Sequence, residues 1–221
     1  MAATPPEPPD LPDADGILAL AEGLGLPPPA EEVLGPLRAY VGLVARWNRR
    51  TALVGPSGGP ALLEVLLADA LVLAAEPELL GDARHLLDVG AGAGAPLIPL
   101  LLLRPNLRAT ALEPRRRRVT FLRLAAGSLP GLTERLDVLE GRVDPAGPEP
   151  PAPADLAMSR ATFPPEQWLR LAPRLAPEGL LLAARVPTPW PETLRVTARR
   201  AYTLPSGAPR LLLRFAQAEA G

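Results

Sequence analysis

The chain is 221 residues long, and its hydrophobic content of 48% is enough for one substantial core. The absence of cysteine excludes a disulfide framework and a thiolate metal site, and a single histidine excludes a histidine cluster, so we expect no metal. The acidic, proline-rich start is unlike a secretory signal, and the longest apolar run, near residues 97–103, is too short to cross a bilayer. We therefore expect a cytoplasmic monomer with no membrane partner.

The formal net charge of −1 hides an uneven distribution of charged residues. Residues 1–37 contain seven acids and no base, whereas residues 104–123 contain seven arginines and one acid. This asymmetry predicts one basic face. All 23 basic residues are arginine, so arginine content alone does not indicate a partner, and the position of each arginine must carry that argument.

The first elements in chain order are predicted to be helices. Residues 1–14 are polar and proline-rich and are expected to form a disordered tail. Apolar residues at helical spacing then predict helices over 15–25, 30–49 and 60–75, the first of them capped by Asp13 or Asp15. Together these helices would form an amino-terminal cap over residues 15–80.

From His85 onward, short apolar runs alternate with helical stretches. Strands are predicted at 85–89, 107–112, 135–140, 155–158 and 179–185, and helices at 96–104, 115–128 and 164–175. This alternation is typical of crossover connections in a mainly parallel sheet. The last strands, 197–204 and 210–216, are joined by a turn too short for a crossover and should be antiparallel. We predict an α/β, Rossmann-like domain over residues 81–221.

The most informative motif follows the first of these strands. Asp88 precedes glycines at positions 90, 92 and 94, which leave the backbone bare at the edge where α/β sheets bind ligands. Ala95 and Leu97 stand where a dinucleotide fingerprint requires a third glycine, so the spacing is G-x-G-x-G. With Glu113 closing the next strand, this pattern resembles the class I S-adenosylmethionine-dependent methyltransferases. The alternative is a tight glycine turn that binds no ligand.

Further segments resemble one family within that class, the glucose-inhibited division protein B family, whose members methylate N7 of a guanine in small-subunit ribosomal RNA. The similarity covers most of residues 40–185 and rests on segments 40–49, 87–100, 117–122, 141–144 and 159–161, which stand in the family's order. The resemblance implies an enzyme with S-adenosylmethionine as its cofactor. It also implies 16S ribosomal RNA, or the small ribosomal subunit, as the substrate.

The resemblance carries site residues with it. It implies a cofactor site made of the glycine loop, an acid for the ribose and a pair of residues for the adenine, namely Asp88, Gly90, Gly92, Gly94, Ala95, Glu113, Val143 and Asp144. Arg160, after the fourth strand, would lie on the cofactor or the substrate side. Arg142, Arg160 and Arg185 are candidates to hold RNA phosphate or the guanine O6. The alternatives are a turn cap for Asp144 and a surface ion pair for Arg160.

Four arginines, Arg115, Arg116, Arg117 and Arg118, occupy the first turn of a predicted helix, where cations oppose the helix macrodipole. A phosphate backbone would compensate them through charge-assisted contacts, and binding would then weaken with salt. We therefore interpret the run as RNA-binding. The alternative is a solvated helix face that pairs with acids elsewhere in the fold.

The chain departs from the family at several positions. The family usually carries a histidine and a serine where this chain has Leu66 and Ala70, and a bulky apolar residue and a glycine where it has Ala95 and Leu97. Leu97 in particular stands where it could narrow the approach to the cofactor. Two alternatives therefore stay open: a noncatalytic descendant that only binds RNA, and a methyltransferase of the same class with a protein or small-molecule substrate.

Overall fold

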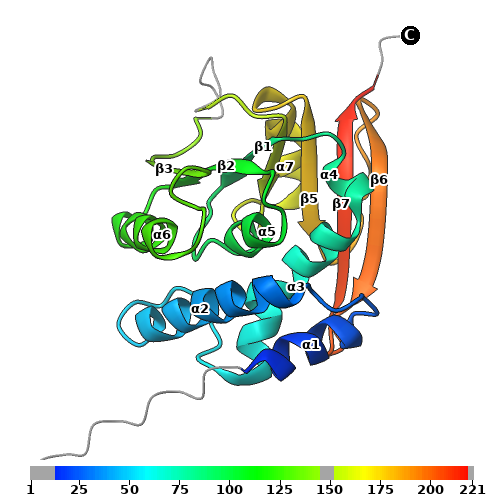
Figure 1. The fold of residues 1–221 in the computed structure, drawn as a ribbon. Coiled ribbons are helices and arrows are strands. Elements are labelled where there is room, and N and C mark those ends of the chain that lie inside the picture. Colours follow the sequence, from blue (N-terminus) through cyan, green and yellow to red (C-terminus); the bar gives the residue numbers. More distant parts are fainter. Residues whose placement is uncertain (1–12, 145–151, 219–221) are drawn as a thin grey trace, which may run out of the picture.

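A seven-stranded sheet forms the centre of the part that the structure, a computed structural model, describes, residues 13–144 and 152–218 (Figure 1). The strands are β1 (His85–Val89), β2 (Arg108–Glu113), β3 (Leu136–Glu140), β4 (Leu156–Ser159), β5 (Glu178–Ala183), β6 (Leu194–Thr203) and β7 (Pro209–Gln217). Their order is β3-β2-β1-β4-β5-β7-β6. Strands β1 to β5 are parallel and β6–β7 form an antiparallel hairpin, which confirms the predicted Rossmann-like class.

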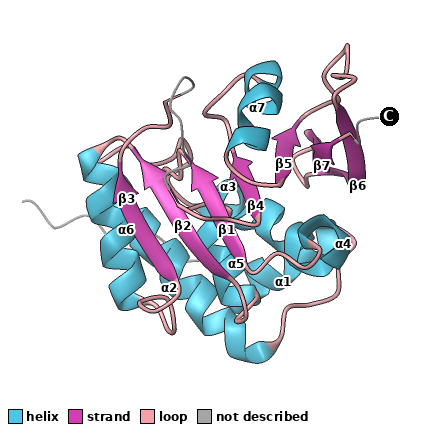
Figure 2. Ribbon diagram, turned by 90° about the horizontal axis from the view of Figure 1, so that it is seen from above, coloured by secondary structure: helices cyan, strands magenta, loops and turns pink. Residues whose placement is uncertain are grey.

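Helices cover the two faces of the sheet unequally (Figure 2). They are α1 (Ala14–Gly23), α2 (Glu31–Asn48), α3 (Gly59–Ala75), α4 (Pro77–Leu80), α5 (Leu97–Leu103), α6 (Arg116–Ser128) and α7 (Pro165–Leu171), which the 3-10 turn Ala172–Arg174 follows. Helices α5 and α6 pack on one face and carry α2 and α3 on their outer side, whereas α7 lies on the opposite face against β5. Successive strands are added on one side of β1 up to β3 and on its other side from β4 onward, and ligands of open α/β sheets bind at such a switch point.

The amino-terminal helices share their core with the sheet. One cluster of buried apolar side chains runs from Ile17 on α1 through Leu67 on α3 and Leu100 on α5 to Leu156 on β4. On its edge, Trp47 of α2 meets Phe121 of α6 edge to face, with ring centroids 5.5 Å apart. A second cluster lies under α7. The helices therefore bury their apolar stripes against the sheet layer as well as against each other.

Most predicted elements lie within a few residues of the observed ones. Asp13 is the cap of α1, because its Oδ1 accepts a hydrogen bond from Gly16 N at 2.9 Å. Strand β6 begins at Leu194, three residues earlier than predicted. The expected disordered tail falls almost entirely on residues 1–12, outside the described residues. Among the described helices, none is both long and apolar enough to cross a membrane.

Candidate functional site

The glycine loop after β1 leaves one stretch of backbone open to a ligand. Gly90, Gly92 and Gly94 all have positive φ angles, of 80°, 60° and 79°. A Cβ on Gly90 would lie 2.2 Å from the Thr162 hydroxyl, and one on Gly94 would lie 2.5 Å from Ile98 Cδ1, so packing explains both. At Gly92 the nearest atoms would be 3.8 Å away. Steric packing therefore accounts for two of the glycines, whereas at Gly92 a Cβ would make only ordinary contacts and the positive φ alone favours glycine.

A buried tyrosine holds this loop from the helical side. The hydroxyl of Tyr40, on α2, donates a hydrogen bond to Ala93 O at 2.9 Å. Complete burial raises the pKa of Tyr40 far above its usual range, so the phenol stays neutral and remains a donor. The sequence shows Tyr40 only as part of an apolar helical stripe. Its contact with a loop 53 residues away has no sequence signal.

Glu113 closes the loop from the β2 side. Its side chain is buried; Oε2 accepts a hydrogen bond from Gly92 N and Oε1 accepts one from Arg115 N, each at 2.9 Å. The carboxylate thus joins the glycine loop to the first turn of α6. Each carboxylate oxygen has a second lone pair. The structure therefore brings the predicted ribose acid next to the open backbone of Gly92.

Asp88 lies beneath the same loop with one oxygen unsatisfied. The residue is 1% exposed, and its Oδ2 has no hydrogen-bond partner among the described residues. Burial raises the pKa of Asp88 to about 7; the cation of Arg160 opposes this shift and the charge of Glu113 adds to it. A buried carboxylate oxygen without a partner is unusual in folded proteins. Asp88 Oδ2 is therefore an acceptor near the loop that a ligand could use.

Arg160 leaves β4 and crosses to the helical layer. Its Nη1 donates to Val65 O at 2.7 Å and to Asp69 Oδ2 at 3.0 Å, both on α3. The hydroxyl of Tyr202, on β6, donates to the other oxygen of Asp69. The Arg160 and Asp69 side chains are 25% and 7% exposed, so this is a partly buried clamp between α3, β4 and β6 rather than a surface ion pair.

The segment that carries Arg160 is tied to the glycine loop. Ser159 Oγ donates to Val89 O at 2.8 Å, and Thr162 Oγ1 lies 3.4 Å from Gly90 O. Between them, Ala161 has a φ of 55°, a left-handed conformation that costs a non-glycine residue energy. The hydrogen bonds on both sides hold this turn against the loop.

The family departures at Ala95, Leu97, Leu66 and Ala70 lie in the core. Leu97 is 0% exposed and packs in the cluster shared with α3, and the other three side chains are buried too. Leu97 therefore does not stand over the open backbone of the loop. The expectation that it narrows the cofactor approach is wrong, because the first turn of α5 directs this side chain inward.

The other predicted residues are spread along the sheet edge. Arg142, Val143 and Asp144 follow β3, where Gly141 N donates to Glu113 O at 3.2 Å; Val143 is half-buried, while Arg142 and Asp144 are exposed. The exposed Arg185 lies beyond the end of β5. Since β2 and β1 separate β3 from β4, the structure does not bring Arg142 together with Arg160 or Arg185.

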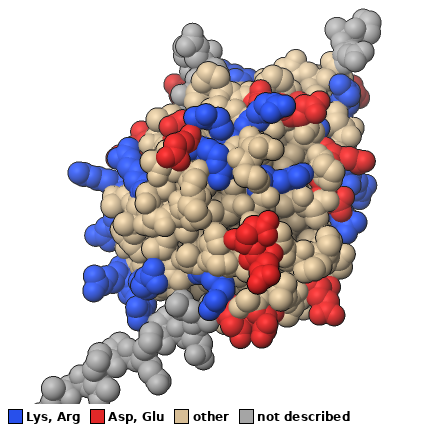
Figure 3. All heavy atoms as spheres, in the orientation of Figure 1, with Lys and Arg blue, Asp and Glu red and all other residues tan. Residues whose placement is uncertain are grey.

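The arginine run at the start of α6 faces solvent. Arg115, Arg116 and Arg117 are exposed and Arg118 is half-buried, and none of the four forms an ion pair within residues 13–144 and 152–218. A Cβ on Gly92 would lie 3.8 Å from Arg118 Nη1, so the run borders the glycine loop. Figure 3 shows basic side chains gathered at the α6 side of the molecule, away from acids over α1.

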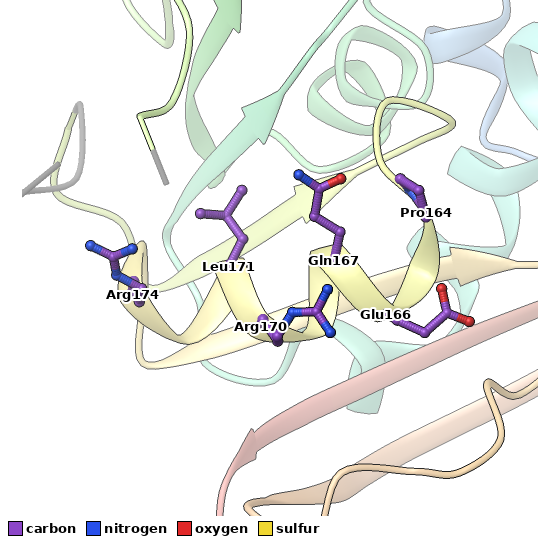
Figure 4. Close-up of a pocket in the computed structure, with 6 residues that line it drawn as sticks. All are labelled: Pro164, Glu166, Gln167, Arg170, Leu171 and Arg174. Atoms are coloured by element: carbon purple, nitrogen blue, oxygen red, sulfur yellow. The ribbon is translucent and has the colours of Figure 1, made fainter. Parts of the chain in front are cut away.

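A separate hollow of about 460 Å³ lies beside α7 (Figure 4). All of its lining residues come from the single segment 164–174. It lacks the glycine loop, Glu113 and Arg160, and it is therefore not the candidate site.

Comparisons with known proteins agree with this geometry. The family described as rRNA small subunit methyltransferase G, GidB, matches residues 34–204. A ribosomal RNA small subunit methyltransferase G from Anaeromyxobacter sp. (strain Fw109-5) is 36% identical over 168 residues, 75% of this chain and 76% of the relative. The protein of the same description from Myxococcus xanthus (strain DK1622) is 33% identical and is matched over 92% of this chain and 96% of its own length.

Among solved structures, the METTL16 methyltransferase domain has a TM-score of 0.54 at 10% identity, covering 85% of this chain and 81% of that one, which shows a shared fold. The sequence match is far more specific, because it spans the glycine loop, Glu113 and the Arg160 segment in one alignment range. The chain therefore belongs to the rRNA small subunit methyltransferase G family, a family of S-adenosylmethionine-dependent class I methyltransferases.

Proposed function

We propose that this protein transfers the methyl group of S-adenosylmethionine to N7 of a guanine in 16S ribosomal RNA. The observation that carries the proposal is the family match over residues 34–204, within which the fold sets an open glycine backbone and a buried acid side by side at the carboxyl edge of the sheet. We also infer that the protein works as a monomer in the cytoplasm, where its ribosomal substrate is made.

The residues at the loop fit an adenosyl cofactor. Gly92 presents backbone without a side chain and without a close steric contact, and Glu113 offers acceptor lone pairs to ribose hydroxyls. Asp88, with its unsatisfied oxygen, suits the cationic amino-acid end of such a ligand. Val143 and Asp144 follow β3, on the far side of Glu113, where the adenine would lie. When bound, S-adenosylmethionine supplies a methyl carbon made electrophilic by its sulfonium.

The chain's own task is alignment rather than proton transfer. Guanine N7 attacks with a lone pair and has no proton to lose, so no general base is required. Positive charge moves from the sulfonium to the base during transfer, and the buried carboxylates of Asp88 and Glu113 favour a cation at this edge. Arg160, fixed by Asp69 and Val65 O, has Nε and Nη2 left to donate toward the guanine O6.

We assign a supporting role in RNA binding to the run Arg115–Arg118. Arg118, half-buried, borders the glycine loop, and the exposed Arg115, Arg116 and Arg117 precede it; none of the four has an ion-pair partner in the described part of the chain, so they are available to phosphate. Arg142, exposed after β3, would extend the same basic edge.

The test combines cofactor binding with methylation. Calorimetric titration of S-adenosylmethionine should give saturable binding, and purified protein should incorporate labelled methyl into 16S ribosomal RNA as 7-methylguanosine. Binding of RNA without any binding of the cofactor at millimolar concentration would support a noncatalytic descendant instead. Binding of the cofactor without transfer to RNA would support a methyltransferase with another substrate.

A further inference from the structure

Two adjoining hollows lie on the β5 side of Arg160, outside the cofactor loop. The first, of about 460 Å³, lies between α3, the segment after β4 and the β6–β7 hairpin, and its wall includes Asp69, Arg160 and Phe163. The second, of about 440 Å³, lies over the ends of β5, β6 and β7. Ala184 and Arg210 line both hollows, so the two adjoin, and the pair is called the groove below.

The first hollow carries both signs of charge, Glu64 and Asp69 against Arg160 and Arg210. The acids of the first hollow are already engaged: Glu64 accepts hydrogen bonds from the backbone N and the hydroxyl of Ser206, at 2.9 and 2.6 Å, and Asp69 accepts from Arg160 and Tyr202. The guanidinium group of Arg160 keeps two donor nitrogens for an acceptor placed in the hollow.

The second hollow is lined by arginines and by no acid. Its charged residues are Arg185, Arg199 and Arg210, contributed by the segment after β5, by β6 and by the start of β7. Within residues 13–144 and 152–218 none of the three forms an ion pair, and Arg210 Nη1 contacts only the carbonyl of the preceding residue, at 3.2 Å. Arg199 and Arg210 leave opposite faces of the β6–β7 ladder, so the three arginines are spread along the rim of the hollow. Guanidinium groups spread in this way suit an anionic chain better than a single small anion.

We propose that this groove binds the substrate RNA strand, with phosphates on Arg185, Arg199 and Arg210 and the acceptor guanine in the hollow between Arg160 and Phe163. The proposal rests on the proposed function and adds the path of the RNA. Phe163, half-buried and stacked on Trp168, offers an aromatic face at the hollow. The hydrogen bond from Thr162 Oγ1 to Gly90 O links the segment that lines this hollow to the backbone of the glycine loop.

The groove favours an unpaired guanosine over one in a helix. In A-form RNA the N7 edge faces a deep, narrow groove that side chains do not reach, whereas an unstacked base can enter a pocket and expose that edge. A hollow walled by an aromatic ring, beside a track of arginines, matches a single strand with one base turned inward. We therefore expect the acceptor in a loop or bulge of the RNA.

The triple variant Arg185→Gln, Arg199→Gln, Arg210→Gln tests the groove, with Arg108→Gln, Arg170→Gln, Arg195→Gln as a matched control. The control arginines are exposed, as Arg185 and Arg199 are, whereas Arg210 is half-buried. They lie outside the groove, and both variants lose the same charge. Methylation of 16S ribosomal RNA is measured as a function of RNA concentration at several salt concentrations, and binding of S-adenosylmethionine is measured separately.

The groove variant should raise the KM for RNA by about tenfold or more and reduce the slope of log affinity against log salt by about 2, as expected for the loss of three single-strand phosphate contacts. Its affinity for S-adenosylmethionine should match that of the wild type. An unchanged KM and salt slope, with methylation intact, would overturn the groove while leaving the proposed function standing. Absence of RNA methylation by the wild type would instead contradict the proposed function.

Discussion

Asp88 carries a pH dependence that follows from its burial. Its pKa is raised from 3.8 to about 7, mainly by desolvation. Between these values the native state holds a proton that the unfolded state has lost, so the free energy of unfolding falls as pH rises from about 4 to about 7 and is level above that. Asp88→Asn removes this loss. The variant's free energy of unfolding should exceed that of the wild type by a larger margin at pH 8 than at pH 5. The two margins should differ by about 2–3 kcal/mol.

Urea unfolding of both proteins at the two pH values measures this gain. Asp82→Asn, at an exposed position before β1, is the matched control and should show no such pH-dependent difference. An Asp88→Asn gain of equal size at both pH values would mean that the carboxyl group titrates normally in the native state.

Glu113 connects structure and cofactor binding in one side chain. Glu113→Gln cannot accept backbone hydrogen bonds on both sides, because its amide nitrogen replaces one acceptor beside Gly92 or Arg115. We expect the affinity for S-adenosylmethionine to fall by about tenfold or more, equivalent to about 1.4 kcal/mol. Calorimetric titration measures it. Glu140→Gln, at the exposed partner position on β3, should bind like the wild type; equal affinity in both variants would remove Glu113 from the ribose site.

The role of a residue was predictable from the sequence where a local motif specifies it. It was not predictable where contacts between distant parts of the chain specify it. The pattern of glycines and the acid at the end of β2 predicted that Glu113 would lie near the glycine loop, and the structure adds the bond between Glu113 and Gly92 N. The clamp of Asp69, Arg160 and Tyr202 joins three elements from distant parts of the chain. No local spacing signals such a contact, and the same holds for the arginines of the proposed groove.

At the scale of elements, α6 begins against its own macrodipole. The structure gives α6 no side-chain cap, and arginines fill its first turn, where positive charge is unfavourable. The triple variant Arg115→Gln, Arg116→Gln, Arg117→Gln should therefore have a higher melting temperature at low ionic strength. Its free energy of unfolding should rise by about 0.3–1 kcal/mol for each charge removed. The gain should shrink in 1 M salt, where exposed charges are screened.

The same α6 variant tests whether Arg115, Arg116 and Arg117 bind RNA. If the side chains touch phosphate, the slope of log RNA affinity against log salt should become shallower by about 2, independently of the β5–β7 groove. A more stable protein with unchanged RNA affinity at every salt concentration would show that the run is a solvated helix face.

Element boundaries were predictable where an apolar run is buried along its length. Strand β1 is such a run and lies at the predicted residues, whereas the first three residues of β6, two of them exposed, were missed. The predicted helix over 164–175 divides into α7 and a 3-10 turn, since Pro173 has no amide hydrogen to donate to an α-helical bond. The short α4 was not predicted, because a single helical turn has no detectable period.

At the scale of the whole molecule, the amino-terminal helices and the sheet meet through both apolar and polar contacts. The main cluster of buried side chains crosses from α1–α3 into α5 and the sheet. Tyr40 on α2 bonds the glycine loop, Asp69 on α3 bonds Arg160 and Tyr202, and Glu64 on α3 bonds the turn of the β6–β7 hairpin. The proposed division into a cap over 15–80 and a methyltransferase domain over 81–221 therefore describes layers of one structure.

This continuity predicts that the helical layer and the sheet unfold in a single transition. Trp47 reports on α2 and Trp168 on α7, so a variant with Trp168 and Trp190 replaced by phenylalanine leaves a probe in the helices, and one with Trp47 and Trp190 replaced leaves a probe on the opposite face. In each variant, urea unfolding is followed by tryptophan fluorescence and by circular dichroism. Both signals should give the same midpoint, because removing either layer exposes the shared core. If the fluorescence of Trp47 changed at lower urea than the dichroism while that of Trp168 did not, the cap would be a separately unfolding unit, and its contacts with the glycine loop would be too weak to hold the cofactor site in place.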